Sequence, residues 1–117
     1  MKIKNVDAAL ELFKEAATIH GEWTENGNYK LGNKNYDKVV KATDYLKMEK
    51  KVDCLCQFLK DSNVSVSLWA ALYLLPICEK DALKVLNEIA KNYKGILSLT
   101  AEVTIKEWEK GNLKNLY

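Results

Sequence analysis

Apolar residues recur at helical spacing from the start of the chain. Between Val6 and His20 they are separated by three or four residues, which is the spacing that places side chains on one face of an α-helix. Asn5 stands immediately before this stripe, where an asparagine side chain can cap the first turn. We therefore expect a helix from Val6 to His20, with an apolar face made of Val6, Ala9, Leu10, Phe13, Ala16, Ala17 and Ile19.

The helical pattern breaks down between Gly21 and Asn35. This segment holds three of the five glycines of the chain and four asparagines, which favour turns over regular helices. We interpret Gly21, Gly27 and Gly32 as turn residues. The composition predicts a long irregular connection that ends where helical spacing returns at Tyr36.

Two amphipathic runs follow this connection. Apolar residues stand at helical spacing over 36–46 and again over 52–59. The charged stretch 49–51 separates the two runs and is expected to form the turn between them. The pattern predicts a helix for each run.

The segment 64–75 is apolar almost all round, which is typical of a helix that is buried on most sides. Residues 61–63, Asp-Ser-Asn, offer a cap for its start, and Pro76 cannot continue its hydrogen bonds. Trp69 and Tyr73 are four residues apart and therefore share one ridge. In a helix this apolar, we expect them to pack in the interior and not to form a binding platform.

Two more amphipathic helices are expected in the last third of the chain. One begins at Asp81, and the other carries an apolar stripe over 97–108 and ends before Gly111, which stands where a C-cap glycine is preferred. The runs 64–72 and 97–105 also alternate as strands do. We favour helices because both runs continue into Ala-, Leu-, Glu- or Lys-rich sequence and no hairpin turn adjoins them.

The chain also repeats itself internally. A shift of 31 residues places the apolar residues of 66–74 over those of 97–105, and a shift near 30 places 52–59 over 82–89. Helix pairs that bury their apolar faces only against neighbouring pairs form solenoids, and roughly three units are needed for stability. We predict a single all-α domain over 1–117: a short right-handed solenoid of two to three HEAT-like helix pairs with an N-terminal capping helix.

The same segments resemble a known family. Residues 61–76, which include Leu-Trp-Ala-Ala-Leu-Tyr-Leu-Leu-Pro, are similar to small bacterial HEAT-like domains of unknown function, as are 82–86 and 101–111. Residues 27–37 are similar to another recurring stretch of that family. Members of such families include immunity partners of secreted toxins. The resemblance implies the HEAT-like fold and a protein-binding role, and it implies no reaction.

The balance of charge gives little support to nucleic acid as a partner. Eighteen lysines oppose sixteen acidic residues, so the formal net charge is only +2, and the chain has no arginine to bind phosphate or guanine with two parallel hydrogen bonds. The alternative function is a HEAT-like nucleic-acid-binding domain that uses lysine-bearing helix ends. Its basic residues would be Lys34, Lys38, Lys41, Lys47, Lys50 and Lys51, between which Asp37, Asp44 and Glu49 are interspersed.

The sequence offers no recognisable catalytic or metal-binding set. His20 is the only histidine and stands at the end of the first expected helix, where a cation complements the helix dipole. Cys54 and Cys56 would point about 200° apart on a helix and could not bind one metal ion together. We expect these two and Cys78 to be free thiols in a reducing compartment. The sequence therefore predicts a protein that is not an enzyme, with no cofactor and no metal.

The location is predicted from the same composition. The start of the chain runs into a charged amphipathic segment, and no apolar run approaches the ~18 residues that would span a bilayer. We expect a cytoplasmic protein with no membrane association.

The expected connection between residues 22 and 37 is the strongest candidate for a partner surface. It concentrates aromatic, amide and lysine side chains, which provide contact area and adaptable hydrogen bonds at interfaces. The partner would be another protein, such as a toxin domain that this protein neutralises. The alternative is that these residues only pin the connection to the helices. The candidate residues are Trp23, Tyr29, Lys30, Asn33, Lys34, Tyr36 and Asp37.

Overall fold

The protein is all-helical over the part of the chain that is described. The computed structural model describes residues 3–25, 27, 29–113 and 117, with side chains described except at 23–25 and 29–32. These residues form helices and no strand, so the prediction of an all-α fold is confirmed. The elements are α1 (Val6–Glu25), α2 (Tyr29–Met48), the 3₁₀ helix η1 (Val52–Phe58), α3 (Val64–Leu74), α4 (Glu79–Asn92) and α5 (Ile96–Glu109).

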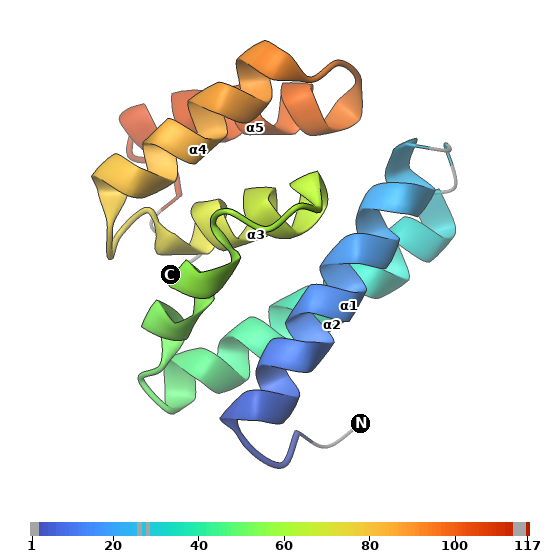
Figure 1. Ribbon diagram of the computed structural model, residues 1–117, viewed down its shortest axis with the longest axis vertical. Helices are drawn as coiled ribbons and strands as arrows, with labels where there is room; N and C mark the ends of the chain where they lie inside the picture. The colour runs from blue at the N-terminus through green and yellow to red at the C-terminus, as the bar shows by residue number, and fades with distance from the viewer. Residues whose placement is uncertain (1–2, 26, 28, 114–116) are drawn as a thin grey trace.

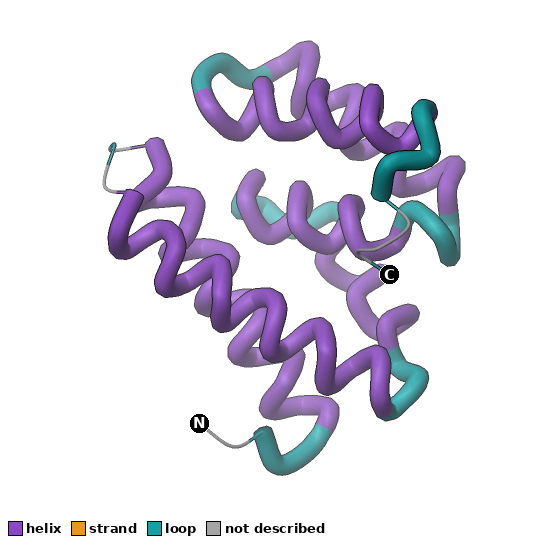
Figure 2. The backbone as a smooth tube through the Cα atoms, turned by 180° about the vertical axis from the view of Figure 1, so that it is seen from behind, coloured by secondary structure: helices purple, strands orange, loops and turns teal. Residues whose placement is uncertain are grey.

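The helices form three layers. In Figure 1, α1 and α2 lie side by side as an antiparallel hairpin, α4 and α5 form a second pair, and α3 lies between the two pairs. The view from behind in Figure 2 shows the same order. The helix α3 contacts α1, η1, α4 and α5, and it is therefore the element around which the core forms.

Burial of α3 is nearly complete, as its apolar sequence predicts. Every residue from Ser65 to Leu74 is buried. The Asn63 side chain caps the helix by accepting a hydrogen bond from the Val66 N–H at 3.2 Å. Two serine hydroxyls near its start donate to backbone carbonyls of neighbouring segments. Ser65 donates to Ala17 and Ser67 donates to Leu59, both at 2.6 Å. The hydroxyl groups of both buried serines are thus satisfied.

The hairpin of α1 and α2 corrects the prediction for the segment after His20. Helix α1 continues to Glu25 and α2 begins at Tyr29, so the long irregular connection that we predicted from Gly21 to Asn35 is wrong. Glycine and asparagine lower helix propensity by about 1 kcal/mol or less each, and packing of each helix along the other outweighs that preference. Only residues 26–28 separate the two helices.

Gly21 is a helix-packing residue, and its interpretation as a turn residue is wrong. It is buried within α1 at the point where α1 meets α3. A Cβ atom built on Gly21 would lie 2.5 Å from the Cβ and 2.8 Å from the Oγ of Ser65. The absence of a side chain therefore allows the two helices to approach closely enough for the Ser65 hydroxyl to reach the Ala17 carbonyl at 2.6 Å.

Helices α2 and α5 end in the same hydrogen-bonded motif. In each, the residue just after the helix has a positive φ, and this residue differs between the two. After α5, Gly111 has φ 77°, and the N–H groups of Gly111 and Asn112 donate to the carbonyls of Trp108 and Glu107. This is a Schellman motif, and it confirms the predicted role of Gly111. After α2, the corresponding residue is Lys50, with φ 58°. A lysine in this conformation is strained, because its Cβ crowds the backbone.

The segment 52–59 is shorter and tighter than the predicted helix. It forms the 3₁₀ helix η1, in which residues three apart lie on one side, and this places both Leu55 and Phe58 in the core. Phe58 stacks on Phe13 of α1 with ring centroids 5.8 Å apart. Because the segment is confined between the turn after α2 and the Asn63 cap, it does not reproduce the α-helical form of its repeat partner 82–89.

Tyr117 ties the end of the described chain to α3. Its hydroxyl donates to the Leu72 carbonyl at 2.5 Å, and its ring meets Trp108 edge-on at 6.0 Å. Burial raises the pKa of Tyr117 to about 12. Trp108 in turn donates from its indole nitrogen to Glu79 at 2.6 Å, which links α5 to α4.

The first prediction concerns the approach of α1 to α3. Gly21→Ala should lower the free energy of unfolding by about 1–2 kcal/mol, because the steric conflict with Ser65 exceeds the roughly 1 kcal/mol gained in helix propensity. Chemical denaturation measures the change, and Glu22→Ala on the exposed neighbouring position is the control. In a Ser65→Gly background the cost of Gly21→Ala should largely vanish. An unchanged or stabilised single variant would contradict the prediction.

The second prediction concerns the end of α2. Lys50→Gly should raise the free energy of unfolding by about 0.5–1 kcal/mol, because glycine adopts a φ of 58° without steric conflict. Lys50→Ala removes the same charge and leaves the conformational strain, so thermal and denaturant unfolding of the two variants isolate the backbone effect. The prediction fails if the alanine variant is as stable as the glycine variant.

Candidate functional site

The residues predicted to form a partner surface lie on the two helices of the hairpin and not on a loop. Asn33, Lys34 and Asp37 are exposed on α2, and Tyr36 on the same helix is half-buried. The side chains of Trp23, Tyr29 and Lys30 lie outside the described residues. The structure thus leaves three polar residues of the predicted set available on one helix.

Tyr36 belongs to an aromatic cluster between the hairpin and α3. Its ring lies 5.3 Å from that of Trp69 and 6.2 Å from that of His20, and Trp69 stacks on Tyr73 at 6.4 Å. The ammonium group of Lys47 lies 5.6 Å from the centre of the Tyr73 ring. Trp69 and Tyr73 are buried, which confirms that they pack in the interior.

His20 is part of this cluster, and its predicted role as the terminal cation of α1 is wrong. The helix continues for more than one turn beyond it, and the histidine ring meets Trp69 edge-on at 5.3 Å. Burial lowers the pKa of His20 below its ordinary value of 6.5. The side chain is therefore a neutral packing group at neutral pH.

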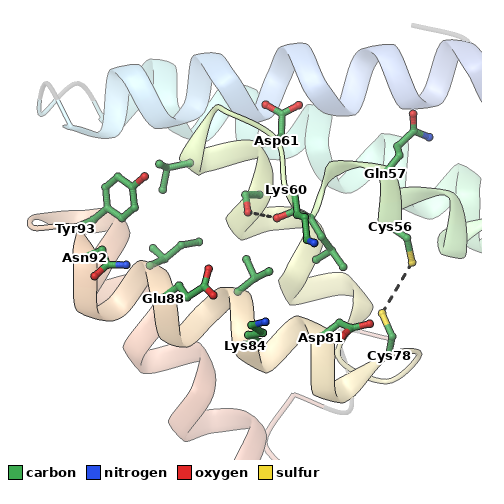
Figure 3. Close-up of a pocket in the computed structure, with 15 residues that line it drawn as sticks. Cys56, Gln57, Lys60, Asp61, Cys78, Asp81, Lys84, Glu88, Asn92 and Tyr93 are labelled. Atoms are coloured by element: carbon green, nitrogen blue, oxygen red, sulfur yellow. Dashed lines mark hydrogen bonds between the residues drawn. The ribbon is translucent and has the colours of Figure 1, made fainter.

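A groove lies between α4 and the segment that runs from η1 into α3. Its volume is about 810 Å³. Figure 3 shows the cysteines Cys56 and Cys78 at one end and Tyr93 at the other, with the polar side chains of α4 along one wall. Its apolar surface comes from half-buried and buried residues of both walls, namely Leu59, Val64, Val85 and Ile89.

Charged side chains of both signs line this groove. Asp81, Lys84 and Glu88 occupy one face of α4, three and four residues apart, and Lys60 lies on the opposite wall. All four are exposed, and none of them forms an ion pair with another described residue.

Asp61 also lines the groove but is already engaged in the fold. It pairs with Lys14 of α1 at 3.3 Å and accepts a hydrogen bond from the Asn63 N–H at 2.8 Å. Its side chain is only 11% exposed. The four other charged side chains of the groove are therefore exposed, whereas Asp61 holds the turn before α3 in place.

All three cysteines are free thiols, as expected from the sequence, and two of them are neighbours in the structure. Cys56, which the sequence places beside Cys54, lies next to Cys78, with the two Sγ atoms 4.0 Å apart. Burial, followed by the neighbouring Cys56 thiol and the charge of Asp81, raises the pKa of Cys78 to about 11. The separation of 22 residues gave no sequence signal for this pair, because the fold of α3 between them brings them together.

Three further possibilities are a metal site, a membrane-spanning helix and a basic surface on α2. Among the described residues no group of three or more His, Cys, Asp or Glu side chains could hold a metal ion. None of the described helices is both long and apolar enough to cross a membrane. In the lysine-rich stretch of α2, Lys47 is engaged with Asp44 at 3.8 Å and with the Tyr73 ring.

No protein-family model, no curated protein and no solved structure matches this chain.

The third prediction follows from the low pKa of His20. Above the ordinary value of 6.5 the histidine is neutral in both the folded and unfolded states; as the pH falls below 6.5, the unfolded chain binds the proton first, so folding stability is lost. Denaturant titrations between pH 7.5 and pH 5 should show this loss, with a slope below the one-proton limit of about 1.4 kcal/mol per pH unit.

The control for this prediction is His20→Gln, which keeps a polar side chain that does not titrate. Its stability should decrease less than that of the native protein over the same pH range. Parallel curves for the two proteins would show that His20 does not carry the effect.

Proposed function

We propose that this protein is a non-enzymatic protein-interaction module and that the groove beside α4 binds a segment of its partner. The observation that carries the proposal is a set of exposed charges around an apolar floor, none of which forms an ion pair within the described part of the chain. Lys60 and Lys84 are available to acidic groups of a partner, and Asp81 and Glu88 are available to basic groups. This combination is typical of protein interfaces, which have an apolar centre and a polar rim.

The alternating charges favour a polypeptide as occupant. Along α4 the order of charge is negative, positive, negative at Asp81, Lys84 and Glu88, which would fix the register of a segment that carries the opposite order. Tyr93, 47% exposed at the end of the groove, adds an amphipathic ring of the kind that is enriched at interfaces.

The partner class that we propose is a toxin domain, which this protein would bind and neutralise. That step rests on the resemblance of 61–76, 82–86 and 101–111 to HEAT-like domains whose relatives include immunity proteins. We also propose that η1 with α3, and α4 with α5, represent two HEAT-like repeat units. The 31-residue repeat and the layered order of these helices support this interpretation.

The exposed polar residues of the hairpin form a second candidate surface for the same partner. Asn33, Lys34 and Asp37 lie together on α2, one to two turns from its start. Substitutions on the two surfaces can be compared directly, because the groove and α2 are formed by different elements.

The fourth prediction is that this protein binds and neutralises a toxin encoded by an adjacent gene. The test is to produce the protein together with that gene product, which would carry a toxic C-terminal domain. The native protein should protect the cells and form a complex that size-exclusion chromatography detects. Lys84→Glu and Glu88→Lys should each weaken the complex by about tenfold, because each reverses a charge at the interface. The melting temperature should remain nearly unchanged, since both side chains are exposed.

The matched control is Lys80→Glu, which reverses an exposed lysine of the same helix that does not line the groove. It should leave affinity unchanged. If Lys34→Glu on the hairpin weakens the complex while the groove variants do not, the hairpin is the binding surface. Absence of both protection and a complex would reject the proposed immunity function.

A further inference from the structure

The thiols of Cys56 and Cys78 form a pair that the proposed binding function does not use. Their Sγ atoms are 4.0 Å apart, close enough for a thiol hydrogen bond, whereas a disulfide requires about 2.05 Å. Cys56 projects from η1, and Cys78 occupies the position before the first turn of α4. Rotation about the Cα–Cβ bonds moves both sulfurs, and this is the motion that would close the distance between them.

We propose that Cys56 and Cys78 are a redox modification site that low-molecular-weight disulfides convert into a reversible intramolecular disulfide. The site requires no partner protein, so this inference is independent of the proposed function. Its chemistry follows from the unequal exposure of the two thiols and from their proximity.

Cys56 is the residue that an external disulfide reaches first, because it is exposed and Cys78 is half-buried. In the first step the Cys56 thiolate attacks one sulfur of the external disulfide. A mixed disulfide forms on Cys56, and the other half leaves as a thiolate that takes up a proton. The adjacent Cys78 is then held beside the new sulfur–sulfur bond.

In the second step Cys78 loses its proton to water and attacks the Cys56 sulfur. The Sγ–Sγ bond forms, and the second half of the external disulfide leaves as a thiol after protonation. The two cysteines lose two electrons and two protons, and the external disulfide gains them as two thiols. Because burial raises the pKa of Cys78 to about 11, the rate of this second step should increase with pH as more of the thiolate forms.

Cys54 provides a control within the same helix. It is half-buried and stands two residues before Cys56, but no contact of its sulfur with another described cysteine is found. A reaction that depends only on the number of thiols would use Cys54 as readily as Cys78. A reaction that depends on the geometry would use only the 56–78 pair.

The disulfide should stabilise the fold, because it would close a loop that contains the whole of α3. For a loop of this length, chain-entropy arguments correspond to a rise in melting temperature of about 10 °C. The bond would also join η1 to the start of α4 across the end of the groove.

The fifth prediction tests this site with the full-length protein and oxidised glutathione. After blocking of residual thiols, intact mass spectrometry should show one blocking group in place of three together with the loss of two hydrogens, and peptide mapping should show the link between Cys56 and Cys78. The melting temperature should rise by about 10 °C, and dithiothreitol should reverse both changes. Cys54→Ser should react like the native protein.

The variants of the pair separate the two steps. Cys78→Ser should keep one glutathione on Cys56, because the resolving thiol is absent, and Cys56→Ser should form no 56–78 bond. A native protein that retains a stable glutathione adduct at Cys56 would overturn the proposal. So would linkage through Cys54, formation of disulfide-linked dimers, or an unchanged melting temperature after complete 56–78 linkage.

Discussion

The structure depends on covering a helix that has no polar face. Since α3 is buried from Ser65 to Leu74, it can be stable only when other elements surround it, and α1, η1, α4 and α5 provide that cover. The buried first turn adds a polar requirement, which serine hydroxyls and the Asn63 cap satisfy. Gly21 meets a steric requirement of the same interface, because α1 can approach Ser65 only where no side chain intervenes.

The surface features follow from this central packing. Helix α4 packs on α3 and buries Ala82, Leu86 and Ile89, whereas its Asp81, Lys84 and Glu88 remain exposed along the groove. That segment cannot pack flush against α4, since it must turn from η1 into the cap of α3. The groove and the close approach of the two cysteines are therefore consequences of how the chain enters and leaves the buried helix.

The central helix and the last helix of the stack differ in how their apolar residues are covered. Leu99 and Val103 of α5 are 59% and 48% exposed, although their repeat counterparts on α3, Leu68 and Leu72, are buried. The same sequence pattern thus has two outcomes, because α3 has neighbours on all sides and α5 is the last helix of the stack (Figure 1). Position in the stack, and not the local pattern, decides which apolar side chains reach the core.

Local chemistry in the sequence determined much of the architecture. The apolar periodicity, the Asn5 and Asn63 caps and Gly111 predicted the helical class and several helix ends, because caps and amphipathic faces act over a few residues. The sequence pattern also predicted the central buried helix. It did not predict the helical form of the region after His20, since the low propensity of its glycines and asparagines is overcome only by packing in the hairpin.

The candidate site was decided by tertiary structure alone. The sequence predicted an amphipathic helix from Asp81, but the position of its polar face opposite Lys60 depends on how distant segments pack. In the same way, Cys54 and Cys56 are close in sequence, yet Cys56 contacts Cys78. This contact forms because the chain returns to η1 after it has passed through α3. Periodicity is a property of one helix, whereas grooves and thiol pairs arise from contacts between elements, and those contacts exist only once the buried helix has been enclosed.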